Sequence, residues 1–110
     1  MNSPTSIDIG NDYSPTPAGR FPDDGPYNGE DFRERILVPA LERGPVMIRI
    51  DTVEGLGSSF LEEAFGGLIR KHSYTEEKLR QLLTIVFDDQ SFRAYERLIW
   101  THISDALKNK

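Results

Sequence analysis

The stretch from Val46 to His72 decides the fold, and it reads VMIRIDTVEGLGSSFLEEAFGGLIRKH. Its first part, residues 46–53, is mostly β-branched or apolar over a length typical of one buried, central strand. Beyond Ser59 the period changes, because apolar residues recur in adjacent pairs at four-residue steps: Phe60, Leu61, Ala64, Phe65, Leu68 and Ile69. The stretch therefore predicts a strand, a tight turn and a helix whose apolar face lies on the sheet.

The turn between this strand and helix carries two glycines and two serines. Gly55 and Gly57 allow backbone angles that other residues avoid, so the chain can change direction abruptly. Glu62 follows Ser59 by three residues, and this capping-box spacing predicts Ser59 as the N-cap. Ser58 is then left just outside the helix. Free N–H groups and the positive dipole end at a helix start favour an anion, so Ser58 and Ser59 are candidate anion-binding residues.

Three segments carry a family resemblance. Residues 50–61, IDTVEGLGSSFL, resemble the signature of STAS-like domains, small α/β modules related to bacterial anti-sigma-factor antagonists. Residues 60–69, FLEEAFGGLI, and residues 28–33, NGEDFR, resemble the STAS-like family whose function is largely unassigned. The similarity covers residues 28–71 well and the two ends weakly. It implies a small layered α/β domain with a role in signalling.

The resemblance also implies a role for the turn. In the better-known antagonists an Asp-Ser-Ser-Gly sequence occupies this position, and a partner kinase phosphorylates its first serine. Ser58 is thereby placed at the phosphoacceptor position, and the implied partner is an ATPase or serine kinase of the anti-sigma type. Gly57 and Phe60 stand where the antagonists have Asp and Gly. We therefore predict that Ser58 serves first as a turn and contact residue and only secondarily as a phosphoacceptor.

Composition narrows the classes of function. A length of 110 residues predicts a single domain, 1–110, with enough apolar content for one core. The absence of cysteine excludes a thiol nucleophile, a disulfide framework and a cysteine-based zinc site. The net charge of −5 argues against nucleic acid as a partner. No apolar run approaches the ~20 residues that span a bilayer, and the N-terminus does not resemble a signal peptide, so we expect a soluble, cytoplasmic protein.

The remaining segments, apart from a long loop over residues 11–28, complete an α/β pattern. Residues 5–9 alternate polar and apolar side chains, as an edge strand does. A helix is predicted over residues 28–43, with Asn28 as its N-cap and a kink at Pro39, where a backbone donor is missing. Residues 84–87, TIVF, do not alternate and predict a parallel strand buried on both faces. Residues 91–108 predict the last packed helix.

The loop over residues 11–28 contains too many prolines for regular strand pairing along its length. A short second strand is expected at residues 12–14 or 19–21. The loop is either a mobile flap or an arm packed on the surface, and its aromatic residues favour the packed arm: Tyr13, Phe21 and Tyr27. Arg20 within it is a third candidate to bind an anion at the Ser58 turn, the strand-to-helix turn that leads into Ser58. The short strand in the loop would be the fourth, beside those at residues 5–9, 46–53 and 84–87. We therefore predict an α/β layered domain with a mixed, mostly parallel sheet of about four strands and helices mainly on one face.

No metal, cofactor or catalytic residue is predicted. The acidic residues that follow the strands are explained by turns and caps: Asp51, Glu54, Asp88 and Asp89. No base lies beside Ser58 in the sequence. His72, at a helix end, and His102, on an apolar face, are both interpreted as structural residues.

Two further features bear on partner binding. Gly66 and Gly67 lie inside a predicted helix, where each glycine costs on the order of 1 kcal/mol relative to alanine. Either close packing inside the domain or the close approach of a partner offsets that cost. Trp100 falls off the centre of the last helix's apolar stripe and is a candidate interface residue.

Two hypotheses of function remain open. The first is a non-enzymatic regulatory or adaptor module that binds a partner protein through the strand-to-helix turn at Ser58–Ser59. The second is a small-molecule or nucleotide-binding domain, with or without catalysis, that uses the same helix N-terminus and the 11–28 loop. The candidate partner-binding residues of the first hypothesis are Gly57, Ser58, Ser59, Glu62, Glu63, Gly66 and Trp100.

Overall fold

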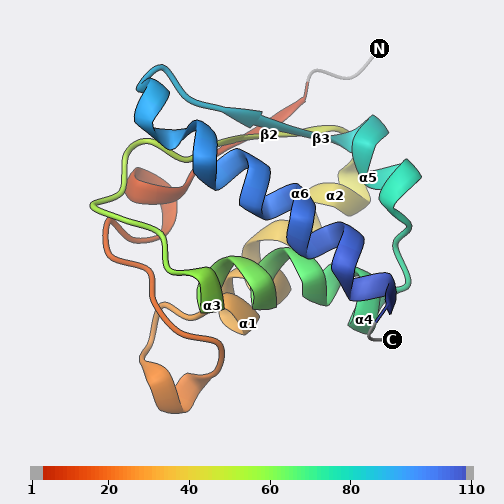
Figure 1. Ribbon diagram of the computed structural model, residues 1–110, viewed down its shortest axis with the longest axis horizontal. Helices are drawn as coiled ribbons and strands as arrows, with labels where there is room; N and C mark the ends of the chain where they lie inside the picture. The colour runs from red at the N-terminus through yellow and green to blue at the C-terminus, as the bar shows by residue number, and fades with distance from the viewer. Residues whose placement is uncertain (1–3, 109–110) are drawn as a thin grey trace.

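The computed structural model describes residues 4–108, so the outermost residues of the predicted 1–110 domain, 1–3 and 109–110, lie outside it. Its sheet has three parallel strands in the order β1 (Thr5–Asp8), β2 (Val46–Arg49) and β3 (Leu83–Val86) (Figure 1). The predicted central strand, β2, and the predicted edge strand, β1, are therefore confirmed, and both pairs of neighbouring strands are parallel.

The prediction of about four strands is wrong, because the described residues form three. The 11–28 loop contains no fourth strand. Residues Ile9–Tyr13 instead form a single wide turn, η1, capped by Asp8, whose carboxylate accepts the Asn11 N–H at 3.1 Å. A short 3₁₀ turn, η2 (Pro22–Asp24), follows, because Pro22 has a fixed φ angle that suits the first position of such a turn.

The first long helix runs without interruption through α1 (Gly29–Phe32), η3 (Arg33–Leu37) and α2 (Val38–Arg43). Asn28 caps it as predicted, since its side chain accepts the Asp31 N–H at 2.8 Å. The helix does not break at Pro39. A π-type turn directly before this proline, in which the Val38 N–H bonds to the Arg33 C=O, accommodates the missing backbone donor.

The second long helix comprises α3 (Ser58–Leu61), η4 (Glu62–Gly66) and α4 (Gly67–His72). Its N-cap is Gly57, with no side-chain cap, so the prediction of Ser59 as N-cap is wrong. The reason is that the Glu62 carboxylate forms ion pairs with Arg20 and Arg70 instead of turning back to the helix start. Ser58 is therefore the first residue inside the helix.

The C-terminal part consists of α5 (Glu76–Leu82), β3, the 3₁₀ turn η5 (Gln90–Phe92) and the longest helix, α6 (Arg93–Lys108). The two long helices and α6 lie on one side of the sheet, which confirms the prediction of helices mainly on one face (Figure 1). Helix α6 packs on η4 and α4, which brings its apolar residues Ile99 and Ile103 into the core. No helix among residues 4–108 has the length and apolar character needed to cross a membrane.

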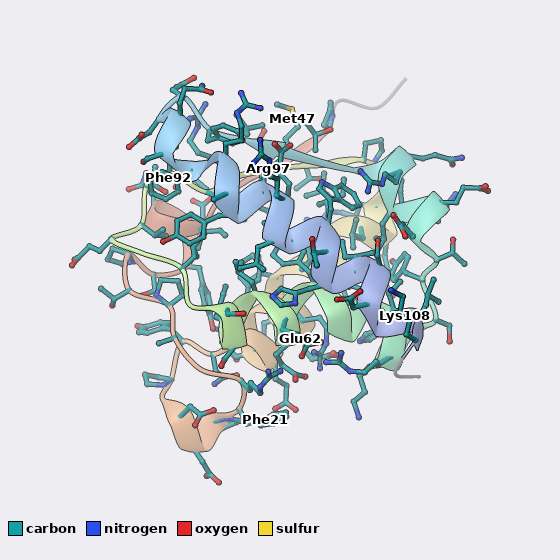
Figure 2. All side chains as sticks on the ribbon, in the orientation of Figure 1. Phe21, Met47, Glu62, Phe92, Arg97 and Lys108 are labelled. Carbon is teal, nitrogen blue, oxygen red and sulfur yellow. The ribbon has the colours of Figure 1, made fainter. Side chains whose placement is uncertain are left out.

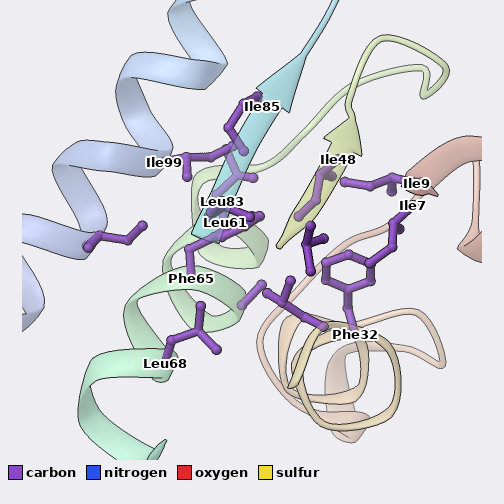
Figure 3. Close-up of a cluster of buried hydrophobic side chains, with 14 of the residues drawn as sticks. Ile7, Ile9, Phe32, Ile48, Leu61, Phe65, Leu68, Leu83, Ile85 and Ile99 are labelled. Atoms are coloured by element: carbon purple, nitrogen blue, oxygen red, sulfur yellow. The ribbon is translucent and has the colours of Figure 1, made fainter. Parts of the chain in front are cut away.

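The core lies between the sheet and these helices. Alternate strand residues Ile7, Ile48 and Ile85 point into it, where they meet side chains such as Phe32 and Phe65 (Figure 3). The intervening residues on the opposite face are exposed: Ser6, Met47 and Thr84. The prediction that the third strand is buried on both faces is therefore wrong, because no layer formed by residues 4–108 covers its outer side.

Candidate functional site

The strand-to-helix turn comprises residues 50–57 and leads into the exposed Ser58 and Ser59. Backbone hydrogen bonds hold it at its start and in its middle, since the Ile50 N–H donates to the Val86 C=O at 3.0 Å and the Glu54 N–H donates to the Pro15 C=O at 2.8 Å. A Cβ atom on either Gly55 or Gly57 would meet nothing within 4 Å.

Gly57 has ordinary extended angles, φ −73° and ψ 147°. The expectation that this glycine supplies a conformation closed to other residues is therefore wrong. Its contribution is open space next to the start of the helix, which leaves the turn accessible from outside.

His102 of α6 lies against this turn. Its Nε2 atom is 3.3 Å from the Ser58 Oγ atom, although the two residues are 44 positions apart in the chain. Burial lowers the pKa of His102, so the neutral imidazole is favoured near neutral pH. Sequence reasoning assigned His102 a structural role and missed this contact, because only the packing of α6 on the second long helix brings the pair together.

Glu62 is one turn into the helix and is held by two arginines. Arg20 from the 11–28 loop and Arg70 from α4 both form ion pairs with its carboxylate. Burial alone would raise the pKa of Glu62, but the hydrogen bonds from Arg70 and Arg20 outweigh it and lower the pKa. Arg20 thus meets an anion near the Ser58 turn, and that anion is the protein's own carboxylate.

Glu63 is almost fully buried and pairs with the equally buried Arg33 of the first long helix. The Arg33 Nη1 atom lies 2.8 Å from the Glu63 Oε2 atom and 2.6 Å from its backbone oxygen. Burial opposes the charged form of Arg33, yet the hydrogen bonds that it donates to Glu63 and Glu34 leave its pKa raised. Glu63 therefore joins the two long helices, and both Glu62 and Glu63 are held by arginines of this chain at the start of the second long helix.

The Gly66–Gly67 pair makes room for these charges. A Cβ atom on Gly67 would lie 2.0 Å from the Arg33 Nη1 atom, and one on Gly66 would lie 2.6 Å from the Glu62 Oε2 atom. Both glycines are buried. The geometry favours close packing inside the domain as the reason for both, so a partner would reach Gly66 only after these side chains move.

The 11–28 loop is packed through Tyr13, as expected for an arm. The Tyr13 hydroxyl donates to the Asp31 Oδ2 atom at 2.7 Å, and its ring lies 5.4 Å from that of Tyr27. Phe21, next to Arg20, is instead 44% exposed, although it was expected to pack (Figure 2). A hollow of about 320 Å³ on this loop does not extend to the Ser58 turn, and its lining residues all belong to the loop: Thr16, Ala18, Asp24, Gly25, Pro26 and Tyr27.

Trp100 is half-buried on α6, and the guanidinium of Arg80 lies 4.0 Å from the centre of its ring. One face of the indole is therefore occupied from within the chain. Its role as an interface residue stays a prediction.

The acidic residues that follow β2 and β3 link the two loops to each other. The Asp51 carboxylate accepts the backbone N–H groups of Asp88 and Asp89 at 2.6 and 3.1 Å, which ties the chain after β2 to the chain after β3. These hydrogen bonds lower the pKa of Asp51, with Asp88 making the largest contribution.

Comparison with known proteins assigns the family. The searches of curated proteins and of solved structures returned no match. A family model described as a STAS-like domain of unknown function (DUF4325) matches residues 28–91, more than half of the chain. This region runs from the cap of the first long helix to the turn before α6 and includes the Ser58 turn, so the chain belongs to this family of STAS-like domains.

Proposed function

We propose that the chain is a non-enzymatic regulatory or adaptor module of the cytoplasm that binds a partner protein through the turn at Ser58–Ser59. By its resemblance to anti-sigma-factor antagonists, the partner is an ATPase or serine kinase of the anti-sigma type. Membership in a STAS-like family supports a regulatory role.

The observation that carries the proposal is an exposed turn on a braced helix. Ser58 and Ser59 face solvent. Directly behind them, Glu62 and Glu63 fix the helix to the loop and to the first long helix through Arg20 and Arg33. A surface held rigid in this way loses little conformational entropy when a partner binds, which favours affinity.

Phe21 extends the same surface. It follows Arg20, whose guanidinium contacts Glu62 on the second long helix, and its own ring is largely exposed. Exposed aromatic residues are enriched at interface centres, so we add Phe21 to the predicted contact residues.

The test is capture of the partner from a lysate of the native host with matched serine variants. Ser58→Arg places a large side chain on the proposed surface, whereas Ser91→Arg makes the same change at an exposed serine in η5. We expect the wild type and Ser91→Arg to retain one partner, identified by mass spectrometry, and Ser58→Arg to lose it. If neither the wild type nor the phosphate-mimicking Ser58→Asp retains a protein, the adaptor proposal fails.

The Ser58–His102 pair favours one second candidate, a site for a small molecule or nucleotide at the same helix start. A hydroxyl within hydrogen-bonding distance of a neutral imidazole, beside the free N–H groups of a 15-residue helix, can bind a phosphate or carboxylate. The same pair has the arrangement of a serine activated by a base.

A thermal-shift screen with nucleotides and phosphorylated metabolites tests this candidate. A ligand at ~100 times its Kd adds ~2.7 kcal/mol of stability. We expect His102→Gln to abolish the shift and His72→Gln, the matched change at the other histidine, to preserve it. A screen without any stabilising compound would leave only the adaptor function.

A further inference from the structure

Residues 4–108 leave one whole face of the sheet uncovered. Ser6, Met47 and Thr84 are exposed on it, one from each strand, and the two long helices and α6 lie on the other side (Figures 1 and 2). Purely parallel sheets are almost always covered on both faces, because their crossovers place helices there. This domain therefore presents a surface on which other α/β proteins carry a second layer of helices.

The uncovered face is hollowed and partly apolar. An open hollow of about 260 Å³ is lined by apolar, acidic and basic side chains together: Ser6, Ile7, Asp8, Asp12, Met47, Arg49 and Val86. Met47 is 38% exposed, unusually open for a large apolar residue at the centre of a sheet. The hollow can accept apolar side chains of a partner.

Charge decides which partner fits. Arg49, on the same face, lies 3.1 Å from the Asp51 carboxylate and 3.2 Å from that of Asp88, so its charge is balanced within the chain. Asp8 and Asp12 form no ion pair with the described residues; their carboxylates accept hydrogen bonds from neutral groups such as the Asn11 side chain and the Asp8 N–H. The hollow and its rim carry an excess of negative charge.

We propose that this uncovered sheet face binds an amphipathic, basic helix of a partner protein. The apolar side of that helix covers Met47 and Val86, and its Lys or Arg side chains reach Asp8 and Asp12. Outer strands of a three-stranded sheet are ~10 Å apart, which matches the ~10 Å diameter of one helix. A single helix therefore completes the missing layer.

The negative charge argues against a second copy of this chain as the occupant. Two such faces would bring their unpaired aspartates together, and the chain carries a net charge of −5. The face is also separate from the Ser58 turn, because α3 and the sheet lie at opposite sides of the molecule (Figure 1). Both surfaces can be occupied at once, so the proposal does not depend on the function proposed for the turn.

The experiment is an NMR titration of the full ¹⁵N-labelled chain with a synthetic 18-residue helix of leucine and lysine, with all leucines on one side. A peptide with glutamate in place of lysine is the control. We expect saturable shifts confined to the sheet, including the amides of Ser6, Met47 and Thr84, and none with the glutamate peptide. Thr84→Lys should weaken binding about tenfold, because it adds a cation to the face.

Thr101→Lys is the matched variant, since Thr101 is exposed on α6 and the change in charge is the same. We expect it to bind the lysine peptide as the wild type does. If Thr84→Lys is not folded by circular dichroism, Ser6→Lys and its control Ser91→Lys replace the pair. Shifts spread over other acidic surfaces, or equal weakening by the two lysine variants, would overturn the proposal. So would a dimer detected by light scattering that Thr84→Lys dissociates.

Discussion

The Gly67→Ala substitution tests how the second long helix is held in place. In an exposed helix this change stabilises by roughly 1 kcal/mol, because alanine has the higher helix propensity. Here the new Cβ atom would lie 2.0 Å from the Arg33 Nη1 atom and 2.8 Å from its Cζ atom. Either the guanidinium or the helix must therefore move.

The cost follows from what the Arg33 guanidinium contacts. Moving it breaks the contacts of 2.8 and 2.6 Å to the Glu63 carboxylate and backbone oxygen, both of which are buried. Breaking a buried ion pair by removing one partner costs about 3–5 kcal/mol. Subtracting the helix-propensity gain leaves a net loss of about 2–4 kcal/mol in the free energy of unfolding.

Urea unfolding followed by circular dichroism at 222 nm measures this loss. Gly66→Ala is the matched control, since its Cβ would meet the Glu62 Oε2 atom at 2.6 Å, and the partly exposed Glu62 and Arg70 side chains can swing aside. We expect it to change stability by less than about 1 kcal/mol. The reasoning is refuted if Gly67→Ala is as stable as the wild type, or if both substitutions cost the same. The loss should also disappear in an Arg33→Met, Glu63→Met background, where no charge is left unpaired.

Three other predictions concern Arg20, His102 and Ser58. Arg20→Ala should lower the free energy of unfolding by no more than about 1 kcal/mol, because the arginine side chain is 40% exposed, and should speed hydrogen exchange in the 11–28 loop; unchanged exchange would contradict its anchoring role. Because burial lowers the pKa of His102, its NMR titration midpoint should lie below 6.5, and it should contribute a loss of stability as the pH falls from about 6.5 through that midpoint. His102→Gln should remove this contribution, and a midpoint above 6.5 would show that the imidazole is not desolvated. Intact-mass spectrometry of the chain from its own host should show mostly unmodified protein, and a dominant single phosphate on Ser58 would make the kinase-regulated switch the leading function.

The local pattern of apolar and capping residues in the sequence determined most of the architecture. The change of period after Val53 identified the strand, turn and helix, because strand and helix place side chains with different repeats. Asn28 was recognised as a cap for the same kind of reason, since a capping side chain bonds only a few residues along the chain. The parallel order of the strands followed from the helices that join them.

The details of the candidate site depended on tertiary structure. Ser59 lost its predicted cap position because Arg20, 42 residues away from Glu62, competes for that carboxylate. His102 reaches Ser58 only after α6 has packed on the second long helix. Met47 is exposed because none of the described helices packs on its side of the sheet. Periodicity records which side of an element is apolar, whereas contacts between distant charged or polar groups depend on how the elements pack, and only the tertiary structure decided those.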